Sequence, residues 1–227
     1  MRTRRTIWWI AGSAAALIGG AVATYPALWR KRCLTWGATA VEADSPMPGD
    51  ELLPRPDLLS TRAVTILAPP GRVWPWLVQM GSGRGGAYTY DWVENLFGLD
   101  MHSAQEILPQ FQDLSVGDVL PVGSGGPRLL VERLEPEHVL VLRSEDGRWI
   151  WAFVLVEVDG ATRLISRNRI ATPDASALAR SFNVIAMEPG SLIMERKMLL
   201  GIKERAQRPT TPGLRAVASD RTVATAP

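Results

Sequence analysis

The feature that most constrains the fold is a run of five strand-like segments followed by one long helical pattern. The segments begin after Asp113 and read DVLPV, PRLLVERL, HVLVLR, RWIWAFVLVEV and ATRLISRNRI. Short turns such as Glu145-Asp146-Gly147 and Asp159-Gly160 join them, which is typical of consecutive antiparallel hairpins. A helical stretch from Ser191 to Ala206 follows, with Glu188-Pro189-Gly190 before it. The sequence therefore predicts an α+β fold in which an antiparallel meander ends in a helix.

The register of the last hairpin follows from its turn. If Asp159-Gly160 is a two-residue turn, Val158 pairs with Ala161, and the side chains of paired residues share a face. One face then carries large apolar side chains and two polar ones, namely Trp149, Trp151, Phe153, Leu155, Leu164, Ser166 and Asn168. The other face carries the arginines Arg163, Arg167 and Arg169. We expect the arginine face to meet solvent and the aromatic face to look inward, where its two polar groups need protein, water or ligand partners.

The segment before the meander has the pattern of one strand and two short helices. Thr61 to Ala68 has strand composition, and the prolines after it open a helix whose apolar residues recur at helical spacing. Pro75 lies in the second turn of this helix, and we expect a slight distortion there. Tyr88 to Phe97 again has helical spacing, and Gly98 ends it.

A glycine-rich loop, QMGSGRGGAYTY, separates these two helices. Gly81, Gly83 and Gly86 match the spacing of a dinucleotide-binding loop. That motif must leave a strand and start a helix, whereas these glycines leave a helix. We therefore expect either a tight bend between helices or a close approach of the backbone to a ligand.

The N-terminal segment predicts a membrane anchor. Residues 6–29 contain no Asp, Glu, Lys or Arg, exceed the length that a helix needs to cross a bilayer, and lie between basic clusters. A cleaved signal peptide is the alternative, because Ala21-Val22-Ala23 resembles a processing site. The two basic clusters are nearly equal, so the charges do not choose the side of the membrane that holds the domain. The predicted location is the cell membrane, with a single span.

Charge and composition divide the rest of the chain. All 23 acidic residues follow position 32, so the part after the anchor carries 19 basic and 23 acidic side chains and gives no basis for a nucleic-acid partner. Prolines make residues 33–59 an expected extended connector, and residues 208–227 have the composition of a disordered tail. The expected divisions are therefore an anchor over 1–32, this connector, a folded domain over 60–207 and the tail.

Three motifs resemble a known family. They are WGAT at Trp36–Thr39, the long stretch PGDELLPRPDLLSTRAVTILAPPGRVWPWLVQMGSGRGGAYTYDWVENLFGLDMHSA, and the late MERKMLLGIKERA. Together they resemble the membrane-anchored, polyketide cyclase/dehydrase-like SRPBCC proteins of the START and Bet v 1-like superfamily. The resemblance implies a helix-grip fold, in which a seven-stranded-type curved antiparallel sheet surrounds the C-terminal helix and encloses an apolar cavity. It carries over no catalytic residues.

Catalytic motifs are absent from the sequence, which has no G-x-S-x-G, H-E-x-x-H or cysteine pair. His138 beside a turn is expected to be solvated, whereas His102 could face the cavity mouth. Asp91 and Glu94 form a pair that could divide acid and base roles if burial separated their pKa values. The simpler interpretation has Asp91 at a helix N-terminus and Glu94 in water. Arg84 could bind an anionic head group or hold the loop to Asp91.

The sequence therefore predicts a membrane-anchored protein that binds a hydrophobic small molecule or lipid, with no cofactor, metal or catalytic residue assigned. Alternatives are a polyketide cyclase/dehydratase-like enzyme that uses Tyr90, Asp91 or His102, and a non-catalytic membrane scaffold with a filled core. Met194 and Met198, one turn apart on the last helix, suit a wall that adapts to varied apolar ligands. The candidate ligand-binding residues are Arg84, Tyr88, Tyr90, Asp91, Trp92, Asn95, Trp149, Trp151, Phe153, Ser166, Asn168, Met194 and Met198.

Overall fold

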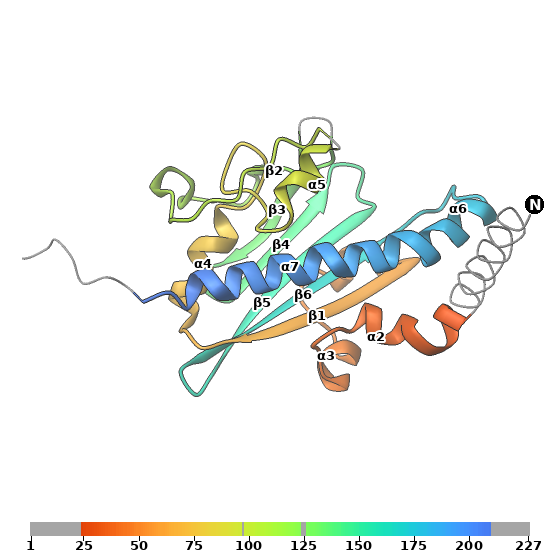
Figure 1. Ribbon diagram of the computed structural model, residues 1–227, viewed down its shortest axis with the longest axis horizontal. Helices are drawn as coiled ribbons and strands as arrows, with labels where there is room; N and C mark the ends of the chain where they lie inside the picture. Colours follow the sequence, from red (N-terminus) through yellow and green to blue (C-terminus); the bar gives the residue numbers. More distant parts are fainter. Residues whose placement is uncertain (1–23, 97, 124–125, 210–227) are drawn as a thin grey trace, which may run out of the picture.

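One antiparallel sheet organises the molecule (Figure 1). The structure, a computed structural model, describes residues 24–96, 98–123 and 126–209. Within these ranges six strands form a sheet in the order β1-β6-β5-β4-β3-β2. The strands are β1 (Leu58–Ile66), β2 (Val119–Pro121), β3 (Arg128–Glu135), β4 (Val139–Ser144), β5 (Trp149–Val158) and β6 (Ala161–Ile170). The predicted meander is confirmed, although the described residues give six strands where the resemblance implied seven.

Two short helices follow β1, as the sequence predicted. They are α4 (Pro70–Val78) and α5 (Asp91–Leu96), and a 3-10 turn, η3 (Pro109–Phe111), lies in the connection to β2. Helix α4 continues through Pro75 without a break. Helix α5 begins three residues later than predicted because Tyr88 has a φ of 58°, a left-handed backbone conformation that a helix cannot contain.

The C-terminal helix lies across one face of the sheet (Figure 1). Helix α6 (Ala177–Phe182), a π-helical turn η4 (Asn183–Met187) and α7 (Glu188–Ala206) follow one another directly. Glu188-Pro189-Gly190, expected before the helix, instead begins α7. Pro189 has no N–H and its ring crowds the preceding turn, so a widened π turn immediately before it accommodates this residue. Leu199 and Ile202 of α7 are fully buried in the main core with Phe153 and Leu164 of the sheet.

The predicted register of the last hairpin is confirmed. Val158 pairs with Ala161, Trp151 with Asn168, and Phe153 with Ser166. The aromatic face looks toward α7, as expected, because the apolar side chains of both strands lie on that side. The inward orientation of the tryptophans therefore follows from one Asp-Gly turn.

The prediction that the arginine face meets solvent is wrong for Arg167 and Arg169. Both side chains are buried beneath the segment before β1, which contains η1 (Tyr25–Trp29), α2 (Arg30–Leu34), α3 (Ala40–Asp44) and η2 (Asp50–Leu52). Arg167 donates to the carbonyl oxygens of Glu42 and Ala43 at the end of α3, and it forms an ion pair with Asp50. The segment before β1, part of which was expected to be an extended connector, is therefore folded over this face of the sheet, and we call it the cover. The arginines bind carbonyl oxygens that the ends of its helices leave free.

The third arginine of this face suggests a pH test of the cover. Arg163 forms an ion pair with Glu42, and its hydrogen bond, together with the N–H of Thr39, lowers the pKa of Glu42 from 4.5 to about 2. A lowered pKa in the folded state stabilises the protein above pH 4.5, and this contribution disappears as the pH falls through 2. Glutamine can still cap α3, so Glu42→Gln removes mainly the charge.

We expect Glu42→Gln to lower the free energy of unfolding by about 2 kcal/mol at pH 7, and by much less near pH 2 to 3. Urea denaturation of both proteins at the two pH values measures this difference. An equal deficit at both values would mean that the charge of Glu42 does not hold the cover in place.

The chain termini fall largely outside the described residues. The described residues do not include 1–23, which contain most of the predicted membrane span over 6–29. They also do not include 210–227, which make up most of the predicted tail. Among the residues that are described, no helix has both the length and the apolar character needed to cross a membrane.

Candidate ligand-binding cavity

A cavity of about 280 Å³ lies between the inner face of the sheet, the N-terminal half of α7 and the loops around α5. An apolar protein cavity of about 150 Å³ holds benzene, so this one has room for a molecule of roughly two fused rings. It lies near the lower end of the range for small-molecule sites. The wall is mostly apolar and includes Met80, Leu129, Leu142, Trp149, Trp151, Met194 and Met198.

Two stacked indoles form the sheet side of the wall. Trp149 and Trp151 lie two positions apart on β5, so both are on its inward face. Their ring centroids are 5.5 Å apart, and their planes are inclined by 19°. The N–H of Trp149 donates to Oδ1 of Asn168 at 2.8 Å, and that of Trp151 donates to Oγ of Ser166 at 2.9 Å. Because both indole donors are used within the protein, the rings are held in place and offer the ligand mainly apolar surface.

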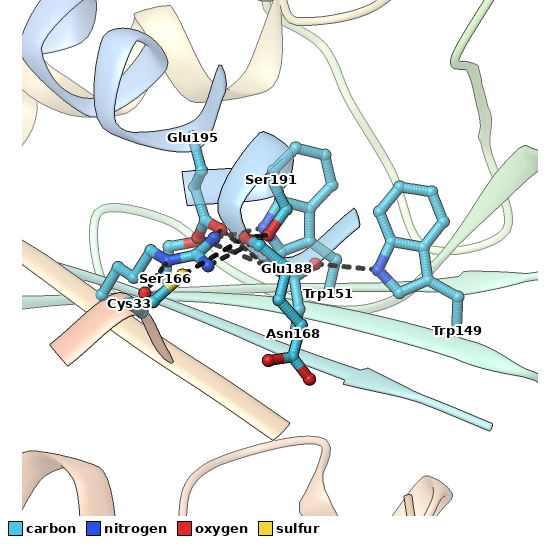
Figure 2. A network of polar contacts seen from close by, with 9 residues as sticks. Cys33, Trp149, Trp151, Ser166, Asn168, Glu188, Ser191 and Glu195 are labelled. Carbon is cyan, nitrogen blue, oxygen red and sulfur yellow. Dashed lines mark hydrogen bonds and ion pairs between the residues drawn. The ribbon is translucent and has the colours of Figure 1, made fainter. Parts of the chain in front are cut away.

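A buried ion pair supports these two tryptophans (Figure 2). Arg62 of β1 and Glu195 of α7 form the pair, and the side chain of Arg62 is fully buried. Ser166 donates to Oε1 of Glu195 at 2.6 Å, and Asn168 donates to both carboxylate oxygens at 3.3 Å. Burial raises the pKa of Glu195, whereas Arg62 and Ser166 act to lower it. Ser166 and Asn168 therefore have protein partners, and they do not by themselves require a ligand.

The same network reaches the segment before β1. Arg62 donates through Nε to the carbonyl oxygen of Cys33, and through the second terminal nitrogen to Oγ of Ser191. Ser191 and the thiol of Cys33 both donate to the carbonyl oxygen of Glu188, whose carboxylate binds Arg30. Figure 2 shows Cys33, Ser191 and Glu195 close together among the dashed contacts. The network thus joins the cover, β1 and the closing helix beside the cavity.

The structure brings five of the predicted ligand-binding residues to the cavity wall. They are Trp149, Trp151, Asn168, Met194 and Met198. Phe153 is fully buried in the core, and Ser166 lies in the polar network against Trp151. Both lie on the predicted face but outside the wall.

The four aromatic and basic candidates near the glycine loop do not line the cavity. Arg84 donates to the carbonyl oxygens of Val78 and Phe111 and packs over the Phe111 ring, so it does not hold the loop to Asp91. Its binding to an anionic head group stays a prediction. Tyr88 is buried and donates to the carbonyl oxygen of Trp76. The other two, Tyr90 and Trp92, lie on the exposed side of α5 and its approach.

The polar candidates of α5 hold a loop. Asp91 accepts from N and Oγ of Ser103, at 2.8 and 2.5 Å, and Asn95 makes two hydrogen bonds with the backbone of Met101. They position the loop so that Met101 reaches the cavity wall. His102, on the same loop, is exposed beside Asp100 and does not face the cavity.

The glycine loop forms the expected tight bend, and a close approach of its backbone to a ligand stays a prediction. Gly81 and Gly86 pair across a tight turn, and a Cβ on Gly86 would lie 2.7 Å from the backbone of His102. The backbones therefore pack too closely for a side chain at that position. Gly81 also forms part of the cavity wall.

Two charged residues of the wall, Arg62 and Glu195, were not among the predicted site residues, although the sequence contains a signal for each. Arg62 shares the inward face of β1 with Val64 and Ile66 at a period of two, and Glu195 precedes Met198 by three residues on one helical face. Glu94, expected in water, is buried, and loss of solvent raises its pKa. Within the described ranges, no group of three His, Cys, Asp or Glu side chains is placed to hold a metal ion.

Comparisons with known proteins give fold-level likenesses. Neither the protein families nor the curated proteins contain a match. Similar solved structures include the Polyketide_cyc-like protein Cgl2372 of Corynebacterium glutamicum, at 16% identity over 66% of this chain and 91% of that one, with a TM-score of 0.41. KanY is 11% identical over 66% of this chain and 98% of its own, with a TM-score of 0.45. CalU16 of Micromonospora echinospora is 15% identical over 65% of this chain and 83% of its own, with a TM-score of 0.33.

The topology of the chain itself defines its class. An antiparallel sheet with two short helices after the first strand and a long C-terminal helix across its face is the helix-grip arrangement that the resemblance noted in the sequence implied. Membership of the membrane-anchored subgroup stays a prediction.

Proposed function

We propose that this protein binds a hydrophobic small molecule or lipid in the helix-grip cavity, while residues 6–29 anchor it to the membrane. The observation that carries the proposal is the cavity itself, with two oriented indoles on one side and methionines of α7 on the other. Aromatic faces and flexible thioethers suit flat or variable apolar ligands. The predicted scaffold alternative required a filled core with Ser166 and Asn168 bonded to protein. Both side chains are bonded to protein, but the cavity leaves the core unfilled.

The position of Met187 supports a route from the membrane. Met187 lies in η4, is 55% exposed and also lines the cavity, so it marks an opening at this end of α7. Turn η4 contacts η1, which forms the last residues of the predicted membrane segment, and Leu28 and Trp29 of η1 are exposed. An anchor attached here would place the opening near a bilayer that concentrates apolar ligands.

The enzyme alternative receives no support from the residues named for it. Tyr90, Asp91 and His102 do not line the cavity. A binding role is therefore the function that the geometry favours.

A cavity-filling variant tests the proposal. We expect Met194→Trp to reduce binding of 2-methylnaphthalene at least tenfold, because the added ring occupies the space that the ligand needs. Ile193→Trp is the matched control, since Ile193, the residue before Met194 in α7, is 58% exposed and does not line the cavity. Equilibrium dialysis of the full chain in detergent, against protein-free micelles, measures both affinities.

The same preparation permits direct identification of a natural ligand by native mass spectrometry and organic extraction. A wild-type protein that binds neither the probe nor an extracted molecule would exclude the proposed function. Equal affinities of Met194→Trp and wild type would place binding outside this cavity.

A further inference from the structure

The cavity wall contains a polar pair that the network around Arg62 does not reach. Glu94 of α5 is 7% exposed, and its Oε2 is buried without a hydrogen-bond partner. Oγ1 of Thr89, five residues earlier, is likewise buried and unpartnered, and both residues line the cavity. Buried polar groups in proteins are nearly always hydrogen-bonded, so an unsatisfied pair on a cavity wall requires an explanation.

Neighbouring polar groups show that the pair does not help to hold the loop. Asp91 and Asn95, on the same helix, direct their oxygens and nitrogens to the loop at Met101 and Ser103. Glu94 makes no such bond and faces the cavity. The loop is therefore held without it, and replacing Glu94 removes no loop hydrogen bond.

The two groups have complementary chemistry. Loss of solvent and the charge of Asp91 raise the pKa of Glu94, whereas the side chain of Thr89 acts to lower it, which places the two wall groups next to each other. A carboxyl oxygen accepts a hydrogen bond, and a threonine hydroxyl both donates and accepts. A ligand hydroxyl has the same double capacity, so one such group can satisfy both wall atoms.

We propose that Glu94 and Thr89 form a site that binds a hydroxyl group of the otherwise apolar ligand. This inference rests on the proposed function and narrows the ligand class to phenols and alcohols whose apolar part lies against Trp149 and Trp151. The ligand hydroxyl donates to Oε2 of Glu94 and accepts from Oγ1 of Thr89. A purely hydrocarbon ligand of the same size would leave both groups unsatisfied.

Two probes of nearly equal size test the inference, namely 2-naphthol and 2-methylnaphthalene. We expect the wild-type chain in detergent to bind 2-naphthol about tenfold more tightly, the value of one hydrogen-bonded polar site. In Glu94→Leu and in Thr89→Val the preference should fall toward one. Glu157→Leu, at an exposed position of β5, is the control and should keep it. Equilibrium dialysis with matched micelle blanks gives each ratio.

The outcomes separate this inference from the proposed function. Equal binding of both probes to the wild type overturns the inference and leaves the proposed function intact, whereas binding of neither probe overturns the proposed function. A preference that survives in Glu94→Leu assigns hydroxyl recognition to another part of the wall and also overturns the inference. If Glu94→Leu does not fold, Thr89→Val decides alone, with Glu94→Gln expected to keep part of the preference because an amide still accepts a hydrogen bond.

A melting experiment distinguishes a binding role from a structural one. Removing an unpaired buried carboxyl should raise the melting temperature of ligand-free Glu94→Leu above that of the wild type. A lower melting temperature would show that Glu94 stabilises the fold, and would contradict a site kept for the ligand.

Discussion

Arg62→Met is expected to lower the free energy of unfolding by about 3 to 5 kcal/mol, the usual result of removing one partner of a buried ion pair. The substitution leaves the carboxylate of Glu195 buried without its cation. It also removes the donors to the carbonyl oxygen of Cys33 and to Ser191. Urea denaturation of the full chain, followed by circular dichroism, measures the loss.

The loss should depend on pH because the remaining carboxyl can be protonated. Without the guanidinium, burial holds the folded-state pKa of Glu195 above the ordinary value of 4.5. A raised acid pKa destabilises the fold increasingly as the pH rises above 4.5, and the penalty disappears below that value. The deficit of Arg62→Met is therefore expected to be larger at pH 8 than at pH 5. A deficit independent of pH would mean that the lost hydrogen bonds, and not the unpaired charge, cause it.

Two further variants identify the source of the effect. Arg128→Met makes the same substitution at an exposed ion pair with Glu145, and it should cost less than about 1 kcal/mol. The double variant Arg62→Met with Glu195→Met replaces the whole pair by apolar groups of similar length, and it should be more stable than Arg62→Met alone. A double variant less stable than the single one would contradict the ion-pair explanation.

The ion pair also bears on the cavity. Glu195 accepts from Ser166 and Asn168, which in turn accept from the two indoles. Loss of this support should leave the tryptophans less well oriented. The stability of the network and the shape of the proposed binding surface are thus consequences of the same contacts.

The sheet could be predicted from sequence because its signals are local. One Asp-Gly turn fixes the pairing of Val158 with Ala161, and the period of two then assigns every side chain of β5 and β6 to a face. The helical spacing around Pro75 and the apolar pattern of Ser191 to Ala206 are equally local. Each of these elements therefore appeared close to its predicted position.

The partners of charged residues could not be predicted in this way. Arg62 meets a carboxylate 133 positions later in the chain, and Arg167 meets one 117 positions earlier. Periodicity assigned Arg167 to the face opposite the aromatics, but nothing local shows that the proline-rich segment folds over that face. Glu94 differs from Asp91 by less than one helical turn, and only the three-dimensional fold determines which of them is buried.

Gly37→Ala should also be strongly destabilising, by about 3 kcal/mol, because the backbones of the cover and β1 touch at this residue. Gly37 has a φ of +73°, and a Cβ built on it would overlap the carbonyl oxygen of Ala63 in β1. The N–H of Ala63 donates to Trp36, and Arg163 donates to the carbonyl oxygen of Gly37. An alanine must displace the cover from the edge of the sheet, and these contacts are lost with it.

Gly160→Ala separates that clash from backbone strain. Gly160 has nearly the same φ, +75°, but nothing lies within 4 Å of an added Cβ, so its cost should be only the left-handed penalty of about 1 kcal/mol. The difference between the two variants in urea denaturation measures the close packing of the cover. Amide hydrogen exchange in Gly37→Ala should increase over α3 while β5 and β6 remain protected, because the cover would open before the sheet. Equal losses of unfolding free energy in the two variants would mean that moving the cover away from β1 requires little free energy. Arg167 and Arg169 would then contribute little to holding the cover in place.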